Sequence, residues 1–194
     1  MRLFIAIEVP LSLRNSLSKI QDKLKISLPL AILIKPPNLH LTLDFLGEIS
    51  PDQVLSISQG IDEITEKTLP FEIKLESLGV FPDYRSPRVI WIGPRHQPER
   101  LKQLVKRLRI GLSTILRPVK LPPFHAHISL SRIKERASPQ DLKGSLLKIQ
   151  ESELKNPLNF KAKGITLFQS SLGPKGPTYT ILKKSKFLRN VLNG

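Results

Sequence analysis

The most constraining feature of this 194-residue chain is that part of its pattern occurs twice. The first copy contains NLHLTL at 38–43, a Ser-Pro step at 50–51 and a strand-like run at 70–75; the second contains FHAHISL at 124–130, a Ser-Pro step at 138–139 and a strand-like run at 157–162. The interval from histidine to proline is 11 residues from His40 and 12 residues from His127, so the copies differ by one loop residue. A duplication of this size predicts two equivalent lobes that place their histidines across a shared cleft.

Apolar periodicity predicts a mixture of strands and helices. Alternating or short apolar runs predict strands at residues 2–9, 30–34, 39–46, 71–81, 88–93, 125–133, 158–170 and 177–187. Helical spacing predicts helices after Pro10, from about 51 to 67, from about 98 to 116 and after Pro139. Ser50, Pro51 and Gln53 supply an N-cap, a first-turn proline and a capping-box partner for the second helix.

Length and composition predict one domain over residues 1–194, built from two closely packed lobes. The longest apolar runs, such as residues 28–34, are far shorter than the roughly 20 residues that a membrane-spanning helix needs. The first ten residues contain an acid and a proline where a signal peptide needs an uninterrupted apolar stretch. The chain has no cysteine, which excludes disulfides and thiol chemistry. We therefore expect a cytoplasmic protein with no membrane segment.

Charge points toward a polyanionic partner. The chain has 31 Lys+Arg against 16 Asp+Glu, a formal net charge of +15. Basic side chains cluster at Lys102, Lys106, Arg107 and Arg109 and again at Lys183, Lys184, Lys186 and Arg189. Such a balance creates an attractive field for nucleic acid, although basic clusters also occur on ordinary solvated surfaces.

Each copy of the repeat places an imidazole beside a hydroxyl. Residues i and i+2 of a strand point to the same face, so His40 projects with Thr42 and His127 projects with Ser129. A hydroxyl can donate to a phosphate oxygen, and an imidazole can give or take a proton near neutral pH. Two such pairs predict an in-line displacement at phosphorus.

A single histidine of this kind on a strand is more often structural than catalytic, but two copies at matching positions reverse that balance. The other two histidines have weaker claims. His96 lies in a polar loop, and His125 shares a strand face with His127 but corresponds to Asn38 in the first copy.

The two motifs resemble the paired signatures of the two-histidine (2H) phosphoesterases. Residues 2–7, 79–82 and 85–91 look more narrowly like the bacterial and archaeal RNA 2′,3′-cyclic phosphodiesterases, once called 2′-5′ RNA ligases. The resemblance covers nearly the whole chain. It departs in the second copy, where Ser129 replaces the usual threonine and Ala126 replaces a common proline.

The resemblance implies an α+β fold that is bilobal and duplicated about a pseudo-two-fold axis, with antiparallel sheets facing a central cleft and helices outside. It implies that Arg132 binds phosphate, and we expect the hydroxyls of Thr42 and Ser129 to bind the phosphate with it. It also implies an RNA substrate with a 2′,3′-cyclic phosphate end that is opened to a 2′-phosphomonoester, with 2′-5′ ligation as the reverse reaction. We expect a monomer that uses neither a metal nor a cofactor.

Two histidines related by a repeat are interchangeable until the substrate chooses an orientation. Positive charge on Arg132 should lower the pKa of His127 and favour its neutral form. We therefore predict that His127 accepts the proton of water and that His40 donates a proton to the leaving oxygen, and the resemblance points the same way.

Three alternatives remain open from the sequence. The chain could be a non-catalytic basic RNA-binding protein, or a 2H phosphodiesterase that acts on a small cyclic nucleotide. It could also be a metallohydrolase that uses His125 and His127 with His40, although no carboxylate at ligand spacing completes that set.

Overall fold

The computed structural model describes residues 1–116, 123–133, 138–174 and 176–188. Its helices are α1 (Leu11–Ser27), α2 (Gln53–Thr65), α3 (Glu99–Gly111) and α4 (Pro139–Glu153), with a 3₁₀ turn η1 (Pro36–Asn38). Its strands are β1 (Arg2–Glu8), β2 (Ile32–Leu33), β3 (His40–Glu48), β4 (Phe71–Leu75), β5 (Ser77–Phe81), β6 (Val89–Gly93), β7 (Ile128–Arg132), β8 (Leu158–Ala162), β9 (Gly164–Gly173) and β10 (Gly176–Lys186).

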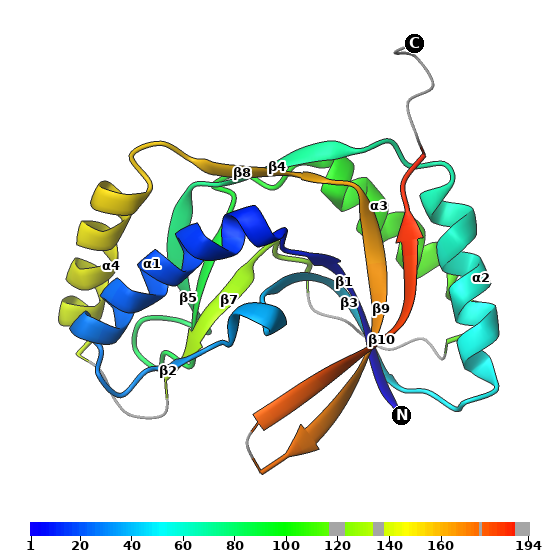
Figure 1. Ribbon diagram of the computed structural model, residues 1–194, viewed down its shortest axis with the longest axis horizontal. Helices are drawn as coiled ribbons and strands as arrows, with labels where there is room; N and C mark the ends of the chain where they lie inside the picture. The colour runs from blue at the N-terminus through cyan, green and yellow to red at the C-terminus, as the bar shows by residue number, and fades with distance from the viewer. Residues whose placement is uncertain (117–122, 134–137, 175, 189–194) are drawn as a thin grey trace.

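The main sheet is built from two halves. Among the described residues, eight strands form one antiparallel sheet in the order β10-β9-β1-β3-β7-β6-β5, and β2 pairs with β7. The sheet is narrow at its centre, where β3 meets β7. Within the described residues these two strands are paired through a single residue pair, Leu41 and Ile128. One half-sheet therefore contains β10, β9, β1 and β3, and the other contains β7, β6, β5 and β2 (Figure 1).

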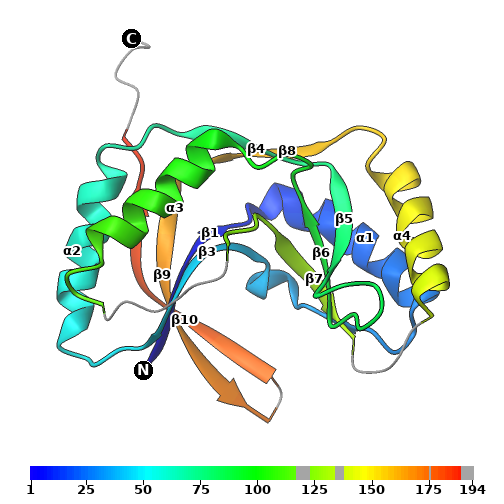
Figure 2. The ribbon, with the colours of Figure 1, turned by 180° about the vertical axis from the view of Figure 1, so that it is seen from behind.

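Each half-sheet carries its own pair of helices, which makes the molecule bilobal. Helices α2 and α3 pack against the half that contains β3, β9 and β10, whereas α1 and α4 pack against the half that contains β5 and β7. The two helix pairs lie at opposite ends of the molecule in both views (Figures 1 and 2). Because α1 follows β1 and α4 precedes β9, neither lobe is a continuous stretch of chain.

The chain crosses between the lobes through a second, two-stranded sheet. Strand β4 leads from α2 to β5, and β8 leads from α4 to β9. These two strands pair with each other, with Ile73 opposite Phe160. They are the equivalent strand-like runs of the two repeats. Each repeat therefore begins in one lobe and ends in the other, and a pseudo-two-fold axis relates the two repeats.

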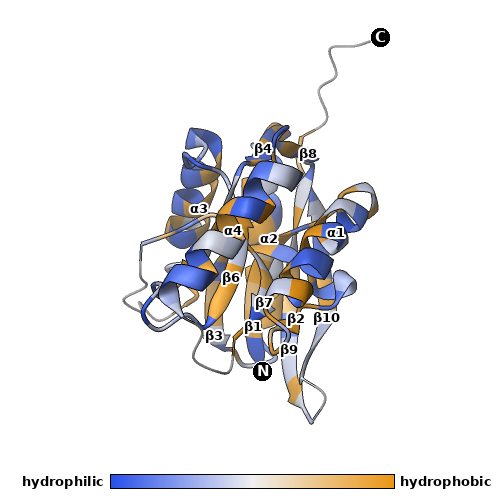
Figure 3. Ribbon diagram, turned by 90° about the vertical axis from the view of Figure 1, so that its left-hand side faces the viewer, coloured by the Kyte–Doolittle hydropathy of each residue, from blue (hydrophilic) through white to orange (hydrophobic). Residues whose placement is uncertain are grey.

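Apolar side chains fill the space between the sheet and the helices. On α1, the residues at helical spacing are buried: Leu13, Leu17, Ile20 and Leu24. Figure 3 shows mainly hydrophobic strands between helices that alternate hydrophobic and hydrophilic segments, as amphipathic helices do. No helix in the described ranges combines the length and the hydropathy that crossing a bilayer would require.

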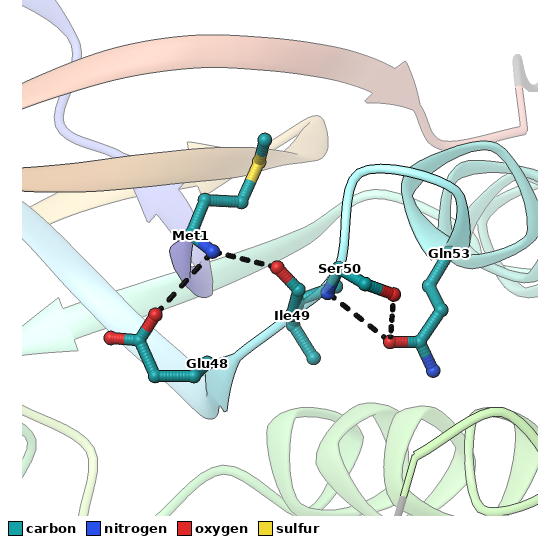
Figure 4. Close-up of polar contacts among 5 residues, drawn as sticks. All are labelled: Met1, Glu48, Ile49, Ser50 and Gln53. Atoms are coloured by element: carbon teal, nitrogen blue, oxygen red, sulfur yellow. Dashed lines mark hydrogen bonds and ion pairs between the residues drawn. The ribbon is translucent and has the colours of Figure 1, made fainter.

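The capping box that the sequence predicts before α2 is present in part. The side-chain oxygen of Gln53 accepts hydrogen bonds from the backbone N–H of Ser50 (3.2 Å) and from its hydroxyl (2.8 Å), as Figure 4 shows. Beside it, the amino group of Met1 donates to the carbonyl of Ile49 at 2.7 Å and lies 3.4 Å from the carboxylate of Glu48. These contacts join the start of β1 to the end of β3.

The predicted α+β, bilobal and duplicated fold is confirmed, but two predicted strands are each divided. The run 71–81 forms β4 and β5 in different sheets, because at Glu76 the backbone N–H turns to the carbonyl of Gly93 (2.9 Å). The run 158–170 divides at Lys163, whose carbonyl accepts from the N–H of Phe187 (2.8 Å). The apolar alternation changes phase at both points, from Leu75 to Leu78 and from Ala162 to Ile165, a signal that treating each run as one strand overlooked.

Two predicted boundaries are also wrong. The helix expected to reach residue 116 ends at Gly111, a residue of low helix propensity that lets α3 approach α2: a Cβ there would lie 3.0 Å from Ile64. The strand expected at 125–133 begins at Ile128, so His125 and His127 precede the ladder.

Candidate active site

The two histidine motifs meet at the narrow centre of the sheet. The antiparallel pair Leu41 and Ile128 places Thr42 opposite His127 and His40 opposite Ser129. Leu41 and Ile128 are fully buried on the core face, so their polar neighbours face the other side. The pseudo-two-fold axis therefore passes between the motifs and sets the two imidazoles diagonally across it.

Both imidazoles are held in the same way. Nδ1 of His40 bonds to the backbone carbonyl of Asn38 at 2.7 Å, and Nδ1 of His127 bonds to the carbonyl of His125 at 2.7 Å. A carbonyl only accepts, so each Nδ1 must carry the proton. In each neutral ring, Nε2 is then the basic nitrogen, available to take a proton and, once charged, to give one.

Aromatic rings fix the plane of each imidazole. Phe4 of β1 lies 4.9 Å from His40 between ring centroids, and Tyr179 of β10 meets His40 edge-on at 5.3 Å. On the other lobe, Phe81 of β5 meets His127 edge-on at 4.9 Å. These contacts restrict ring rotation. The carbonyl bond is made by Nδ1, so Nε2 stays available for proton transfer.

The histidines line one cleft of about 590 Å³. The predicted partners Thr42, Ser129 and Arg132 line it too, so the structure brings all five predicted site residues together. Among the described residues, every charged or titratable acid–base side chain lining the cleft is arginine, histidine or tyrosine, with no carboxylate. Such a lining is suited to an anion such as a phosphate.

Two of the arginines that line the cleft were not predicted from the sequence. Arg2 comes from β1 and Arg88 comes from the residue before β6, and both line the cleft with Arg132. Both were visible in segments already singled out for their resemblance, at 2–7 and 85–91. The repeat itself does not mark them, because they lie outside its two histidine motifs.

A β-bulge turns Arg132 into the cleft. On β6, Trp91 pairs with Ser129 and Ile90 pairs with Ser131, so Leu130 is the extra residue of β7. With regular alternation Arg132 would face the core, but the bulge puts it on the side of Ser129. The buried side-chain amide of Gln21 on α1 donates to the carbonyl of Leu130 at 2.8 Å and so holds the bulge.

Burial lowers the pKa of both cleft histidines. Desolvation lowers the pKa of His40 to about 4, opposed by its bond to Asn38 and assisted by the nearby His127. Desolvation also lowers the pKa of His127, and the nearby His125 adds to the shift. The pKa of His127 is thus lowered, as expected from the sequence, but the causes are burial and the nearby His125 rather than Arg132. Since His40 is shifted as well, these pKa values do not single out the base.

This burial predicts an acidic optimum. One imidazole must be neutral and the other charged, and both pKa values of the free enzyme lie below the ordinary value, so kcat/KM should peak below about pH 6.5 and fall on both sides. A bound phosphate anion stabilises imidazolium, so the kcat profile should lie at higher pH. Both profiles can be measured from about pH 4 to about pH 9. A kcat/KM maximum above about pH 7 would contradict a dominant effect of burial.

The remaining histidines lie outside this cleft. His125 packs edge-on against Trp91 at 4.7 Å and does not line the cleft, and His96 is exposed in the loop after β6. No three His, Asp or Glu side chains of the described residues are placed to hold a metal ion. The set of His125 and His127 with His40 therefore does not form a metal-ligand cluster here.

The basic clusters singled out from the sequence lie elsewhere, and several of their members serve the fold. Arg109 of α3 bonds to the buried Asp44 of β3 at 3.3 Å. Lys183 pairs with Asp62 at 2.7 Å, and Lys184 pairs with Glu8 at 2.9 Å. Arg189 lies outside the described residues. Net charge therefore overstated how much of the basic surface is available for nucleic acid.

Comparison with known proteins identifies a family that fits this geometry. The model of the LigT like Phosphoesterase family matches residues 7–91 and again residues 92–179. The chain belongs to this family. Its two matched segments each contain one histidine motif, and the family assignment confirms the resemblance and the enzyme class expected from the sequence.

Individual relatives agree along nearly the whole chain. An RNA 2′,3′-cyclic phosphodiesterase of Aquifex aeolicus is 32% identical over 178 residues, which cover 88% of this chain and 90% of that protein. Among solved structures, TT0787 of Thermus thermophilus has a TM-score of 0.80 at 29% identity and covers 96% of this chain and 98% of its own. E. coli LigT complexed with 3′-AMP has a TM-score of 0.73 at 28% identity, with coverages of 97% and 98%.

Proposed function

We propose that this phosphoesterase hydrolyses 2′,3′-cyclic phosphate ends of RNA to 2′-phosphomonoesters. The observation that supports this function most is the diagonal pair of imidazoles, each held through Nδ1 with Nε2 available, in a cleft whose cations are arginines. An in-line displacement at phosphorus needs one proton acceptor and one proton donor on opposite sides of the phosphorus. Two histidines related by a pseudo-two-fold axis meet that need.

The proposed reaction balances with water as the only co-substrate. Nε2 of His127 takes a proton from water as the water oxygen bonds to phosphorus. The bond from phosphorus to O3′ breaks, and Nε2–H of His40 gives its proton to O3′. The RNA end then carries a 2′-phosphate and a 3′-hydroxyl. His127 leaves the step charged and His40 neutral, and exchange with solvent restores the starting states.

Charge on the phosphoryl oxygens is stabilised by groups in fixed positions. The hydroxyls of Thr42 and Ser129 can each donate to a non-bridging oxygen, and the guanidinium of Arg132 can grip two oxygens at once. Donors placed before the reaction starts usually contribute the largest part of catalysis. Arg2 and Arg88 extend the positive lining and would attract the phosphates of an RNA strand.

The assignment to RNA rests on the relatives and on the cleft together. The Aquifex aeolicus relative is named an RNA 2′,3′-cyclic phosphodiesterase, and E. coli LigT has been solved with 3′-AMP. We regard residues 1–194 as one domain of two intertwined lobes, acting as a monomer in the cytoplasm without metal. The reverse reaction, attack of a 5′-hydroxyl in place of water, would form a 2′-5′ linkage, but the high concentration of water favours hydrolysis.

The test is product analysis with a defined substrate. An adenosine-terminated RNA 2′,3′-cyclic phosphate should yield predominantly the 2′-monophosphate in chromatography against authentic 2′ and 3′ standards, at a rate unchanged by EDTA. A predominant 3′-phosphate would overturn the orientation. Loss of activity on chelation with rescue by zinc would overturn the two-histidine mechanism.

The rival functions give different results in the same assay. RNA binding without turnover would support a non-catalytic binding protein. Turnover of a free nucleoside 2′,3′-cyclic phosphate, with no gain from added 5′ nucleotides, would favour a small cyclic nucleotide as substrate.

A further inference from the structure

The carbonyl that holds His127 belongs to the peptide group between His125 and Ala126. The carbonyl of His125 accepts from Nδ1 of His127 at 2.7 Å, and the other polar end of the same peptide group is the N–H of Ala126. A peptide group is planar, so a partner that fixes the direction of this N–H also fixes the direction of the carbonyl. The orientation of the imidazole therefore depends on what accepts the hydrogen bond from Ala126.

In the first lobe the corresponding N–H is satisfied by nearby backbone. It belongs to Leu39, and it donates to the carbonyl of Pro36 at 3.2 Å at the end of the 3₁₀ turn η1. The N–H of Asn38 donates to the carbonyl of Lys35 at 2.8 Å in the same turn. Hydrogen bonds of this local turn therefore orient the carbonyl of Asn38, which holds His40.

In the second lobe a distant side chain takes the place of that turn. Residues 123–127 form neither helix nor strand. The side-chain oxygen of Gln97 accepts from the N–H of Ala126 at 3.3 Å, and its amide group donates to the carbonyl of Phe124 at 2.7 Å. Outside the ladders, no backbone-to-backbone hydrogen bond between described residues involves residues 124–126. Gln97 thus pairs with this segment as a neighbouring strand would.

The N–H of Ala126 needs an acceptor because it is buried. Ala126 is 0% exposed, and its carbonyl packs against Gly93, where a Cβ would lie 2.5 Å from that oxygen. A buried backbone N–H destabilises the fold unless a partner satisfies it. The proline that is common at this position in the 2H phosphoesterases has no N–H and fixes φ through its ring. Alanine at 126 therefore creates a need that proline would not create, and Gln97 meets it.

Gln97 is itself well placed to hold the segment. It directly precedes α3, where the carbonyl of Pro98 accepts from the N–H of Leu101 (3.0 Å) and of Lys102 (3.1 Å). The first turn of the helix thus fixes the backbone from which Gln97 extends. Gln97 does not line the catalytic cleft, so it can influence the reaction only through the segment that it holds.

We propose that Gln97 is a positioning residue for His127 and acts through the peptide group between His125 and Ala126. Its side chain, the peptide group and the imidazole form a chain of hydrogen bonds that ends at Nδ1, and the bonds of such a chain polarise one another. With the carbonyl of His125 fixed, the proton stays on Nδ1 and Nε2 stays free to accept a proton from water. The role in catalysis rests on the proposed function, whereas the role in selecting the tautomer does not.

The tautomer of His127 gives a test that needs no turnover. Nitrogen-15 NMR at about pH 8, where both cleft imidazoles are neutral, distinguishes the ring nitrogen that carries the proton. Gln97→Met keeps the length of the side chain but removes both hydrogen bonds, so it should add the Nε2–H tautomer at His127 and leave His40 protonated at Nδ1. Gln103→Met, at an exposed glutamine of α3, is the matched control and should change neither ring. An unchanged Nδ1–H tautomer at His127 in Gln97→Met would overturn the proposal.

Rescue by proline tests the route through the peptide group. Gln97→Met should lower kcat on an RNA 2′,3′-cyclic phosphate by about 3- to 10-fold with little change in KM, the effect of losing a neutral hydrogen bond. Ala126→Pro removes the N–H that Gln97 satisfies, so in that background Gln97→Met should lower kcat by less than about twofold. Equal losses in the two backgrounds would overturn the proposal.

The two measurements also separate this proposal from the proposed function. If the wild-type protein opens no cyclic phosphate, the proposed function fails, and the tautomer of His127 in Gln97→Met still decides whether Gln97 positions the imidazole. The same measurement decides if Ala126→Pro does not fold.

Discussion

Replacing His40 or His127 with alanine should lower kcat on an RNA 2′,3′-cyclic phosphate by roughly 10²- to 10⁴-fold in each case, the typical contribution of a positioned acid or base. Each imidazole is held by one carbonyl bond and by aromatic contacts, so its replacement removes a proton-transfer group that is fixed in position. Steady-state kinetics on both variants check this result. The double variant should be little worse than either single variant, because the two histidines act as a unit.

His125→Ala is the matched control for His127→Ala. His125 lies two residues away and packs on Trp91 outside the cleft, so its removal should change kcat only slightly. If His125→Ala lost as much activity as His127→Ala while remaining folded, the assignment of the second catalytic histidine would be wrong.

Folding of these variants is best compared above about pH 7. Burial lowers the pKa of both cleft histidines in the folded protein, so the folded state prefers neutral imidazole. The stabilising contribution of that preference is fully present above the unfolded pKa and is lost as pH falls toward the folded pKa. An unfolding measurement at acidic pH would therefore favour the alanine variants and obscure any damage to packing.

Much of the site could be predicted because it depends on local rules. The rule that residues i and i+2 of a strand share a face paired His40 with Thr42 and His127 with Ser129, and the structure keeps both pairs on the cleft. The repeat predicted that the two motifs would meet. It also marked the runs that became β4 and β8, although their pairing across the axis follows from the crossing of the chain between lobes.

The rest depends on contacts between distant segments. Leu130 becomes the extra residue of a bulge only through the pairing of β7 with β6, so alternation alone would have turned Arg132 toward the core. Gln21 lies 109 positions before the carbonyl that it holds. The pKa values depend on burial, which the repeat does not fix, and this is why Arg132 was wrongly expected to govern His127.

The two walls of the cleft differ in chemistry, and this difference favours one assignment of the roles that the pKa values leave open. Burial lowers the pKa of both histidines, so the pKa values do not decide which histidine is the acid and which is the base. The walls of the cleft differ instead: Phe45 and Leu172 offer apolar surface on the side of His40, and Arg132 offers charge on the side of His127. We expect the nucleoside to lie at the first wall, which would leave water to the second, and this placement predicts His40 as the acid.

A substrate whose leaving atom needs no proton tests this assignment directly. In a 2′,3′-cyclic phosphate with sulfur in place of the bridging O3′, the leaving thiolate has a conjugate acid of pKa about 8.5, against about 16 for water as a guide to an oxygen leaving group. His40→Ala, expected to be roughly 10²- to 10⁴-fold slower than wild type on the oxygen ester, should come within about tenfold of wild type on the sulfur ester. His127→Ala should remain slow on both esters, because water must still lose its proton. Release of thiol, followed with a thiol reagent, measures the rates. Selective rescue of His127→Ala would exchange the two roles, and rescue of neither variant would mean that His40 does not protonate the leaving atom.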